Sequence, residues 1–216
     1  MKVSEAIEKR ASIRQFLDTP VSDETLWNLL ELAARAPSGG NVQPWRVYVV
    51  NGGSMTRFRE FLSDREPSRP EYEVYPPNLW DPYRTNRFEL GEAMYATMGI
   101  GREDKPARYA HLARNMDFFG APAAFFCFVD RKMGEAQWGD LGMFLQTFML
   151  GAMEVGLDTC AQEAWAPQWK NVQEFVGAPA EEMLFCGMAI GERDVDASVN
   201  SLRSDRMPLD AWAKFV

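Results

Sequence analysis

Residues 140–163 read DLGMFLQTFMLGAMEVGLDTCAQE, and this stretch holds the longest apolar helix that the sequence predicts, followed by a strand. The helix is expected over 140–155 and the strand over 158–163. Further along the chain, 167–176 has the pattern of another helix, and 183–190 is apolar enough for a buried strand. Helices and strands therefore alternate through the second half of the chain.

Toward the N-terminus the pattern stays mixed. Residues 123–129 are apolar on both faces, which predicts a central strand, and 45–50 predicts another strand after a glycine-containing loop. Helices are expected over 4–10, 22–36, 54–62, about 89–98 and about 103–116, the first three capped by Ser4, Ser22 and Ser54. A length of 216 residues with 46% hydrophobic residues is typical of one globular domain.

A proline-rich stretch, 64–88, interrupts this pattern with five of the 13 prolines. It predicts a long excursion over the surface. Four aromatic residues in or beside it are candidates for a lid over a planar substrate, although a flap packed on the body explains them equally well: Trp80, Tyr83, Phe88 and Tyr95.

Charge and composition exclude several classes of function. The chain has 23 basic and 31 acidic residues, a net charge of -8 and no run of Lys or Arg, so nucleic acid is not an expected partner. The charged start MKVSEAIEKR lacks the apolar stretch of a signal peptide, and 142–153 is too short and too polar to span a bilayer. The sequence thus predicts a cytoplasmic protein without a membrane partner.

No familiar catalytic apparatus is present. The cysteines Cys127, Cys160 and Cys186 are far apart, so neither a metal site nor a disulfide framework is expected. The single histidine, His111, excludes mechanisms that need two imidazoles, and a lone histidine is usually a surface or packing residue. The motifs GxSxG, GxxxxGK[ST] and GxGxxG are missing. Any enzymatic activity is therefore expected to depend on a bound cofactor.

Arg10, Ser12 and Arg14 form the first candidate site, because an extended backbone places alternate residues on one face. Two guanidinium groups and a hydroxyl suit a phosphate or a ring carbonyl. A solvated polar face beside a core-facing Ile13 explains the same pattern.

Two further segments are candidates. The loop 37–45, PSGGNVQPW, offers close backbone approach and uncharged donors, but an ordinary helix-to-strand turn needs the same residues. Near the C-terminus, Asn200, Arg203 and Arg206 add polar and cationic groups, and a solvated tail is the alternative there.

Taken together and in order, these segments resemble the FMN-dependent nitroreductase family. The resemblance rests on RASIRQF, APSGGNVQPW, FFGAPAAFFCF, DLGMFLQTFMLGAMEVGLDTCAQEAW, and AIGERD with VNSLRSDRMPLDAW. It implies an α+β fold with a central, mostly antiparallel sheet flanked by helices. It also implies an intertwined homodimer that binds FMN at the subunit interface.

The resemblance also implies roles for particular residues. Flavin N5 carries the chemistry, so no side chain is expected to be catalytic. Ala161 and Ala164 depart from the family's flavin-edge pattern, in which Glu163 is retained. The residues expected to bind the cofactor are Arg10, Ser12, Arg14, Pro37, Ser38, Gly39, Asn41, Asn115, Gln162, Glu163, Arg203 and Arg206, with 37–41 supplied by the partner subunit.

The function that the resemblance implies is hydride transfer from NADH or NADPH through FMN to a small planar aromatic acceptor, either a nitroaromatic or a quinone. Another flavin-dependent reaction on the same fold, such as reductive dehalogenation, is one alternative. A non-catalytic flavin-binding dimer is the other. Within the single domain 1–216, the region 64–118 is expected to be an insertion or lid. The region 196–216 is expected to be an arm that wraps around the partner, since Leu209, Trp212 and Phe215 need a surface that buries them.

Overall fold

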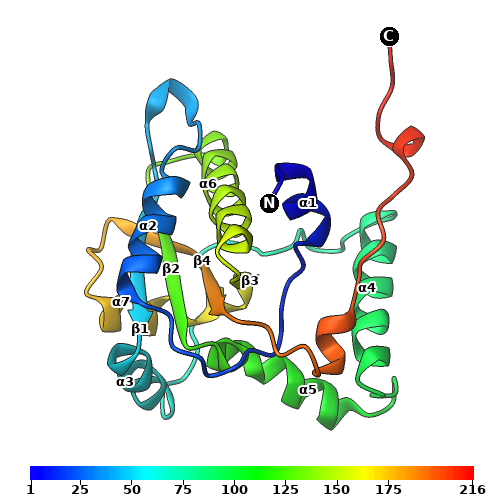
Figure 1. Cartoon of the computed structure of the whole chain (residues 1–216), viewed down its shortest axis with the longest axis horizontal. Coiled ribbons are helices and arrows are strands. Elements are labelled where there is room, and N and C mark those ends of the chain that lie inside the picture. The colour runs from blue at the N-terminus through cyan, green and yellow to red at the C-terminus, as the bar shows by residue number, and fades with distance from the viewer.

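The computed structural model describes residues 1–216, and a four-stranded antiparallel sheet forms its centre (Figure 1). The sheet order is β1-β2-β4-β3, so β1 and β3 are its two edges. The predicted α+β class and the antiparallel sheet are confirmed. The strands are β1 (Arg46–Asn51), β2 (Ala123–Asp130), β3 (Asp158–Gln162) and β4 (Glu182–Gly191).

The central position of β2 follows from its composition. Every residue of β2 except the last is buried, as expected for a strand that is apolar on both faces. β2 pairs with β1 on one side, where Val49 lies opposite Phe125, and with β4 on the other, where Met188 lies opposite Phe125. The prediction of a central strand over 123–129 is confirmed.

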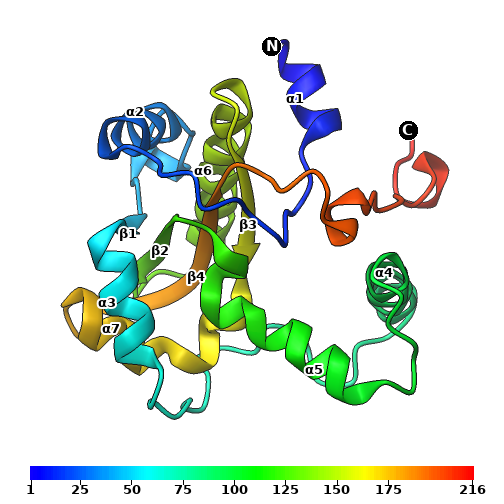
Figure 2. The same ribbon diagram turned by 60° about the horizontal axis from the view of Figure 1, so that its bottom comes forward.

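Helices cover both faces of this sheet (Figures 1 and 2). On one face, α2 (Asp23–Ala33) and α6 (Glu135–Glu154) share an apolar core with β2 and β4. On the other face, α3 (Gly53–Leu62) and α7 (Trp169–Val176) enclose a second core around Trp165. Each large side chain buried in these cores contributes about 1.5–3 kcal/mol, so the two layers hold the sheet rigidly.

Of the three predicted helix caps, Ser22 is confirmed, and Ser54 and Ser4 are wrong. Ser22 caps α2, where its Oγ accepts a hydrogen bond from the Thr25 amide at 3.0 Å. Ser54 lies inside α3, and its Oγ is engaged with the backbone of Asn51, accepting from N at 2.8 Å and donating to O at 2.9 Å. Gly52, with φ near 50°, provides the turn that starts this helix.

Three other helix boundaries also differ from the predictions. Ser4 lies inside α1 (Val3–Lys9), which begins instead with a contact between the Lys2 amide and the Glu5 carboxylate at 3.2 Å. The helix α6 begins five residues before the predicted start, since Gln137 accepts a hydrogen bond from the Gly134 amide and closes the first turn. The helix α4 (Tyr83–Thr97) starts directly after Pro82, within the stretch predicted as irregular.

The excursion between α3 and α4 is attached to the body at its beginning. The Ser68 amide donates to the Pro167 carbonyl at 2.7 Å, and the Tyr72 hydroxyl donates to the Phe185 carbonyl. After this attachment the chain continues to α4, none of whose residues is buried. Figure 2 shows α5 (Lys105–Ala113) leading from the body toward α4. A lid function for 64–118 stays a prediction.

The C-terminal segment runs past α4 and then leaves the body (Figure 1). Its 3-10 turn Ser198–Ser201 contacts α4, and Asn86 of α4 contacts Met207. Leu209, Trp212 and Phe215 are exposed in the single chain. None of the helices combines the length and the apolar character needed to cross a bilayer.

Candidate functional site

The N-terminal segment lies along β3, an edge strand of the sheet. The Ile13 amide donates to the Thr159 carbonyl at 3.1 Å, and Ser12 forms a short parallel bridge with Thr159. Ile13 is fully buried, which fixes the side chains on either side of it at the surface beside the strand. Arg10 and Arg14 are half-buried there, and neither guanidinium is paired with a carboxylate.

The segment that follows β4 brings Asn200 and Arg203 to the same place. The Asn200 amide oxygen accepts from the Arg14 backbone N–H at 2.9 Å, and its amide nitrogen donates to the Gln15 carbonyl at 2.7 Å. Arg203 donates to the Asn200 carbonyl at 3.2 Å. Asn200 lies 186 residues from Arg14 and 185 residues from Gln15 in the chain, so only the fold brings these groups together.

Gln162 and Asn115 form a third part of this site. The Gln162 amide nitrogen donates to the carbonyl and the side-chain oxygen of Asn115, at 3.0 and 3.1 Å. Gln162 is only 2% exposed, and its Oε1 is buried without a hydrogen-bond partner. Glu163 follows directly after β3. The residue as a whole is exposed, but its carboxyl group is partly buried, and this burial raises the pKa of the carboxyl group.

Arg114 belongs to the same site, although the sequence analysis did not select it. Its Nη1 donates to the Gln15 side chain at 2.5 Å and to the Arg14 carbonyl at 3.5 Å. Arg114 directly precedes the candidate residue Asn115, and this position was a sequence signal that could have selected it. No local pattern connects Arg114 with Arg14, which lies 100 residues earlier in the chain. We call Arg10, Arg14, Arg114 and Arg203 the guanidinium cluster.

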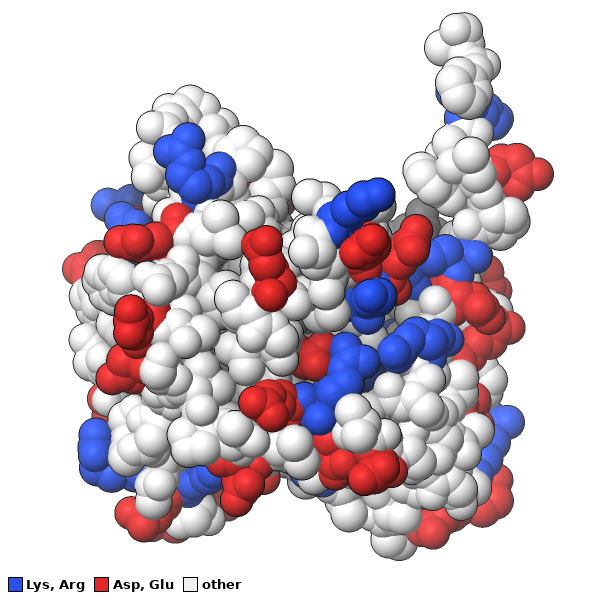
Figure 3. Space-filling model, viewed as in Figure 1, with Lys and Arg blue, Asp and Glu red and all other residues white.

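The guanidinium cluster makes this region positive in an acidic protein. Figure 3 shows Lys and Arg side chains gathered below α1, where the N-terminal segment descends beside the sheet. Burial raises the pKa of the Cys160 thiol of β3, and the charges of Arg14 and Arg10 and the Ser12 hydroxyl oppose that shift. Guanidinium groups without a carboxylate partner, in a site that also holds an orphaned amide oxygen, fit a ligand that has both an anionic group and a hydrogen-bond donor.

The predicted loop lies in another part of the structure, beside α6, and comprises Pro37, Ser38, Gly39 and Asn41. The Gly39 amide donates to the Asp140 carboxylate near the start of α6 at 3.2 Å, and Ser38 Oγ accepts from the Gln43 amide at 3.0 Å. Positive φ angles at Gly40 and Asn41 give the turn its shape. No hydrogen bond joins this turn to the guanidinium cluster within one chain.

Arg206 also lies apart from the other predicted residues. Its Nη1 donates to Ser204 and to the Asp205 carbonyl in its own segment, and the residue is exposed. The structure therefore brings together Arg10, Ser12, Arg14, Asn115, Gln162, Glu163 and Arg203, and it separates 37–41 and Arg206 from them.

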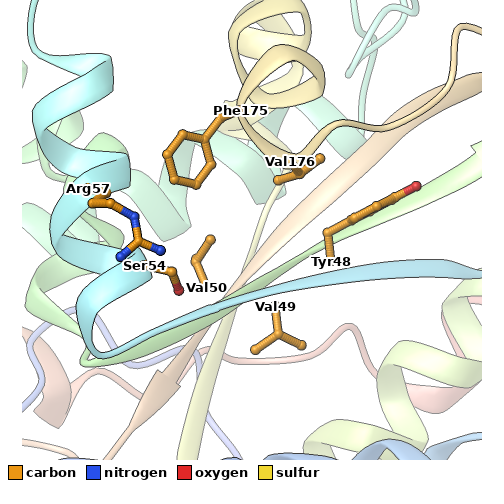
Figure 4. Close-up of a pocket in the computed structure, with 7 residues that line it drawn as sticks. All are labelled: Tyr48, Val49, Val50, Ser54, Arg57, Phe175 and Val176. Atoms are coloured by element: carbon orange, nitrogen blue, oxygen red, sulfur yellow. The ribbon is translucent and has the colours of Figure 1, made fainter.

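A surface cavity of about 330 Å³ lies at the opposite edge of the sheet, beside β1 (Figure 4). Tyr48 and Val50 of β1, Arg57 of α3 and Phe175 of α7 line it. None of the predicted site residues belongs to this cavity, so we place the candidate site at β3.

Comparisons with known proteins show which family the chain resembles along its length. The model of the family described as "Nitroreductase family" matches residues 7–192. The nitrobenzene nitroreductase of Ectopseudomonas oleovorans is 34% identical, over 99% of this chain and 96% of that protein.

Two solved structures are also similar. One is the FMN and NADPH-dependent nitroreductase NfnB from Sphigopyxis sp. strain HMH, with a TM-score of 0.96 and 41% identity over 100% of this chain and 99% of that one. The other is the FMN-dependent NfnB from Mycobacterium smegmatis in complex with NADPH, with a TM-score of 0.92 and 27% identity over 99% and 98% of the two chains.

Proposed function

This chain belongs to the nitroreductase family, and from that membership and the guanidinium cluster we propose that it is an oxidoreductase that uses NAD(P)H and FMN to reduce nitroaromatic compounds. The observation that carries the proposal is the set of guanidinium groups beside β3 that have no carboxylate partner, in a chain that matches FMN-dependent enzymes along its whole length. A reaction that consumes NAD(P)H favours the cytoplasm as its location.

The residues at β3 fit FMN. Arg10 and Arg203 would hold the phosphate with paired hydrogen bonds, and Arg14 would face the pyrimidine side of the ring. The buried Oε1 of Gln162 needs a donor, and the N–H of a flavin imide has that chemistry. Arg203 and Arg206 both bond to carbonyl groups of their own segment, but only Arg203 bonds to Asn200, which itself contacts Arg14 and Gln15. We therefore assign the phosphate to Arg203 in preference to Arg206.

FMN held by these residues would supply the hydride-transfer chemistry between NAD(P)H and the acceptor. This chain contributes fixed positive charge: backbone hydrogen bonds to Asn200 and Thr159 hold Arg14 and its neighbours in place before a ligand arrives. Preorganised charge of this kind stabilises negative charge at little reorganisation cost. Glu163 lies where β3 ends, beside the same edge.

We further propose that the protein is a homodimer and that the turn 37–41 completes the site of the partner subunit. The separation of that turn from the guanidinium cluster supports this arrangement. Exposed apolar side chains on α1 and α6, namely Val3, Ile7 and Met143, also need a covering surface. The exposed C-terminal arm also needs a covering surface, and a partner subunit would supply that surface.

The test is a cycle of reduction and reoxidation without oxygen. Protein loaded with FMN should lose its flavin absorbance when NADH or NADPH is added and regain it when nitrobenzene or 4-nitrobenzoate follows. Loss of absorbance with no recovery on any nitroaromatic compound would contradict the proposed acceptor, and no loss of absorbance would contradict the proposed enzyme. Sedimentation with protein and flavin detected together tests the dimer, because removal of 207–216 should release FMN and produce monomers together.

A further inference from the structure

Asp140 interrupts an apolar stripe on α6. The residues that follow it at intervals of four, Phe144 and Phe148, are each 1% exposed and belong to the core that α6 shares with the sheet. Residues four apart share one face of a helix, so an apolar side chain is expected at position 140. The structure instead buries a carboxyl group there, and Asp140 is 5% exposed.

Burial of this carboxyl group has a cost that packing does not explain. Asp140 Oδ2 is buried and has no hydrogen-bond partner, which is unfavourable for any polar atom. The other oxygen, Oδ1, accepts a hydrogen bond from the Gly39 amide at 3.2 Å. This bond is the only one that the Asp140 side chain makes, so the role of the carboxyl group is to be sought in the turn that contains Gly39.

The turn 37–41 is otherwise attached only to itself and to the residues that follow it directly. Ser38 Oγ accepts from the Gln43 amide at 3.0 Å. Asn41 and Gln43 have positive φ angles, which residues other than glycine rarely adopt without support from their surroundings. The hydrogen bond to Asp140 is the one that joins the turn to another helix or strand.

A second contact fixes the end of the same loop to the same face of α6. Trp45, which follows the turn and precedes β1, stacks on Phe144 with ring centroids 5.0 Å apart and an angle of 15° between the rings. Phe144 comes one helical turn after Asp140, so the two contacts are neighbours on α6. Figure 1 shows the loop between α2 and β1 beside this helix. The stacked rings keep the chain close to α6, and the bond to Asp140 fixes the turn itself.

The turn keeps free hydrogen-bond donors. Gly40 and Asn41 are exposed, and neither the Gly40 amide nor the side-chain amide of Asn41 donates a hydrogen bond within the chain. Uncharged donors of this kind suit the carbonyl and hydroxyl oxygens of FMN. In the proposed dimer these donors belong to the site of the partner subunit, which supplies the guanidinium cluster of that site.

We propose that Asp140 is a positioning residue for FMN binding, which acts through the Gly39 amide to hold the turn 37–41 against the FMN of the partner subunit. The inference rests on the proposed function and extends it to a residue that acts through the turn. Each FMN site then depends on Arg14 of one subunit and on Asp140 of the other.

FMN titrations of the protein freed of cofactor test the contact with Gly39. Asp140→Ala should weaken FMN binding by about tenfold, and Asp140→Asn, which keeps a side-chain oxygen for the amide, should restore most of the affinity. Asp130→Ala is the matched control, because it removes a similar bond from the Lys132 amide, at 2.8 Å, in a turn without candidate residues. Wild-type affinity in Asp140→Ala, equal losses in Asp140→Ala and Asp130→Ala, or no recovery in Asp140→Asn would overturn the proposal.

Mixed dimers test whether Asp140 serves the site of the partner. One chain carries Arg14→Gln, the other carries Asp140→Ala, and two different affinity tags isolate the dimers that contain both chains. If Asp140 acts on the partner's FMN, one site of the mixed dimer has lost both residues and the other has lost neither. Such dimers should bind one FMN with wild-type affinity, whereas neither parent dimer has a site of this affinity. A mixed dimer without a wild-type site would overturn the proposal, because both residues would then serve the same subunit's site.

Amide hydrogen exchange at Gly39, followed by NMR without FMN, separates this inference from the proposed function. Loss of the Oδ1 acceptor in Asp140→Ala should speed the exchange several-fold. An unchanged rate, or a wild type that binds FMN as a monomer, would overturn this inference and leave the proposed enzyme standing. A wild type that binds no FMN would refute the proposed function and this inference with it.

Discussion

The ion pair between Arg193 and Asp158 connects the start of β3 to the segment that follows β4, and its loss should destabilise the fold. Arg193 Nε donates to Asp158 Oδ2 at 2.6 Å, and its Nη2 bonds to the other carboxylate oxygen. The Asp158 side chain is 8% exposed and that of Arg193 is 23% exposed. Arg193→Met keeps the apolar stem and leaves the carboxylate buried without its partner.

Removal of one partner from a buried ion pair costs about 3–5 kcal/mol, and the partial exposure of Arg193 places this pair at the lower end, about 3 kcal/mol. A comparison within the chain is available in Arg65 and Glu174, which also bond through two guanidinium nitrogens, at 3.0 and 3.2 Å. Their side chains are 37% and 57% exposed, so Arg65→Met should cost less than about 1 kcal/mol.

Urea unfolding of the two variants measures this difference. The double variant Arg193→Met with Asp158→Asn should recover part of the lost stability, because no charge is then left buried. Equal unfolding free energies for Arg193→Met and Arg65→Met would refute the argument that burial makes the Arg193–Asp158 pair contribute more to stability than the Arg65–Glu174 pair.

Three further changes test other parts of the structure. Because the pKa of His111 is lower in the folded protein than in the unfolded chain, the stability that it contributes is present above the unfolded pKa of about 6.5 and is lost as the pH falls below it. Urea unfolding between these pKa values should therefore show a steeper pH dependence for the wild type than for His111→Gln. Ser22→Ala removes the cap of α2 and should lower the unfolding free energy by about 1 kcal/mol. A decrease of less than a few tenths of a kcal/mol would mean that the cap is not needed. Gly187→Ala would place a methyl group against the Trp165 ring and should cost about 1–3 kcal/mol in thermal unfolding, and an unchanged melting temperature would show that Trp165 moves freely.

Elements with a strong apolar pattern were predictable from the sequence. The run 123–129 has no polar residue, and it is the central strand β2. Helix boundaries were less predictable where a contact between polar groups determines the first turn. The Gly134 amide donates to the Gln137 side chain, and this contact starts α6 earlier than the sequence predicted. The start of α4 directly after Pro82 was not predicted, although the fixed φ of proline suits the position before a first helical turn.

The candidate site was predictable only in part, because its contacts join distant segments. Arg14 and Arg203 were selected through local pattern and resemblance. Arg114 was not, because its link to Arg14 exists only when the turn 114–120 lies against the N-terminal segment. The orphaned Oε1 of Gln162 likewise depends on how Asn115 is placed.

The measurement that tests the central claim most directly is an FMN titration of the protein freed of cofactor, compared between wild type, Arg14→Gln and Arg57→Gln. Arg14 belongs to the guanidinium cluster at β3, and Arg57 lines the cavity at the opposite edge. Loss of a charge-assisted hydrogen bond costs about 1.5–3 kcal/mol, so Arg14→Gln should weaken FMN binding by roughly 10- to 150-fold while Arg57→Gln matches the wild type. Wild-type affinity in Arg14→Gln, or weakened binding in Arg57→Gln alone, would contradict the location of the site at β3.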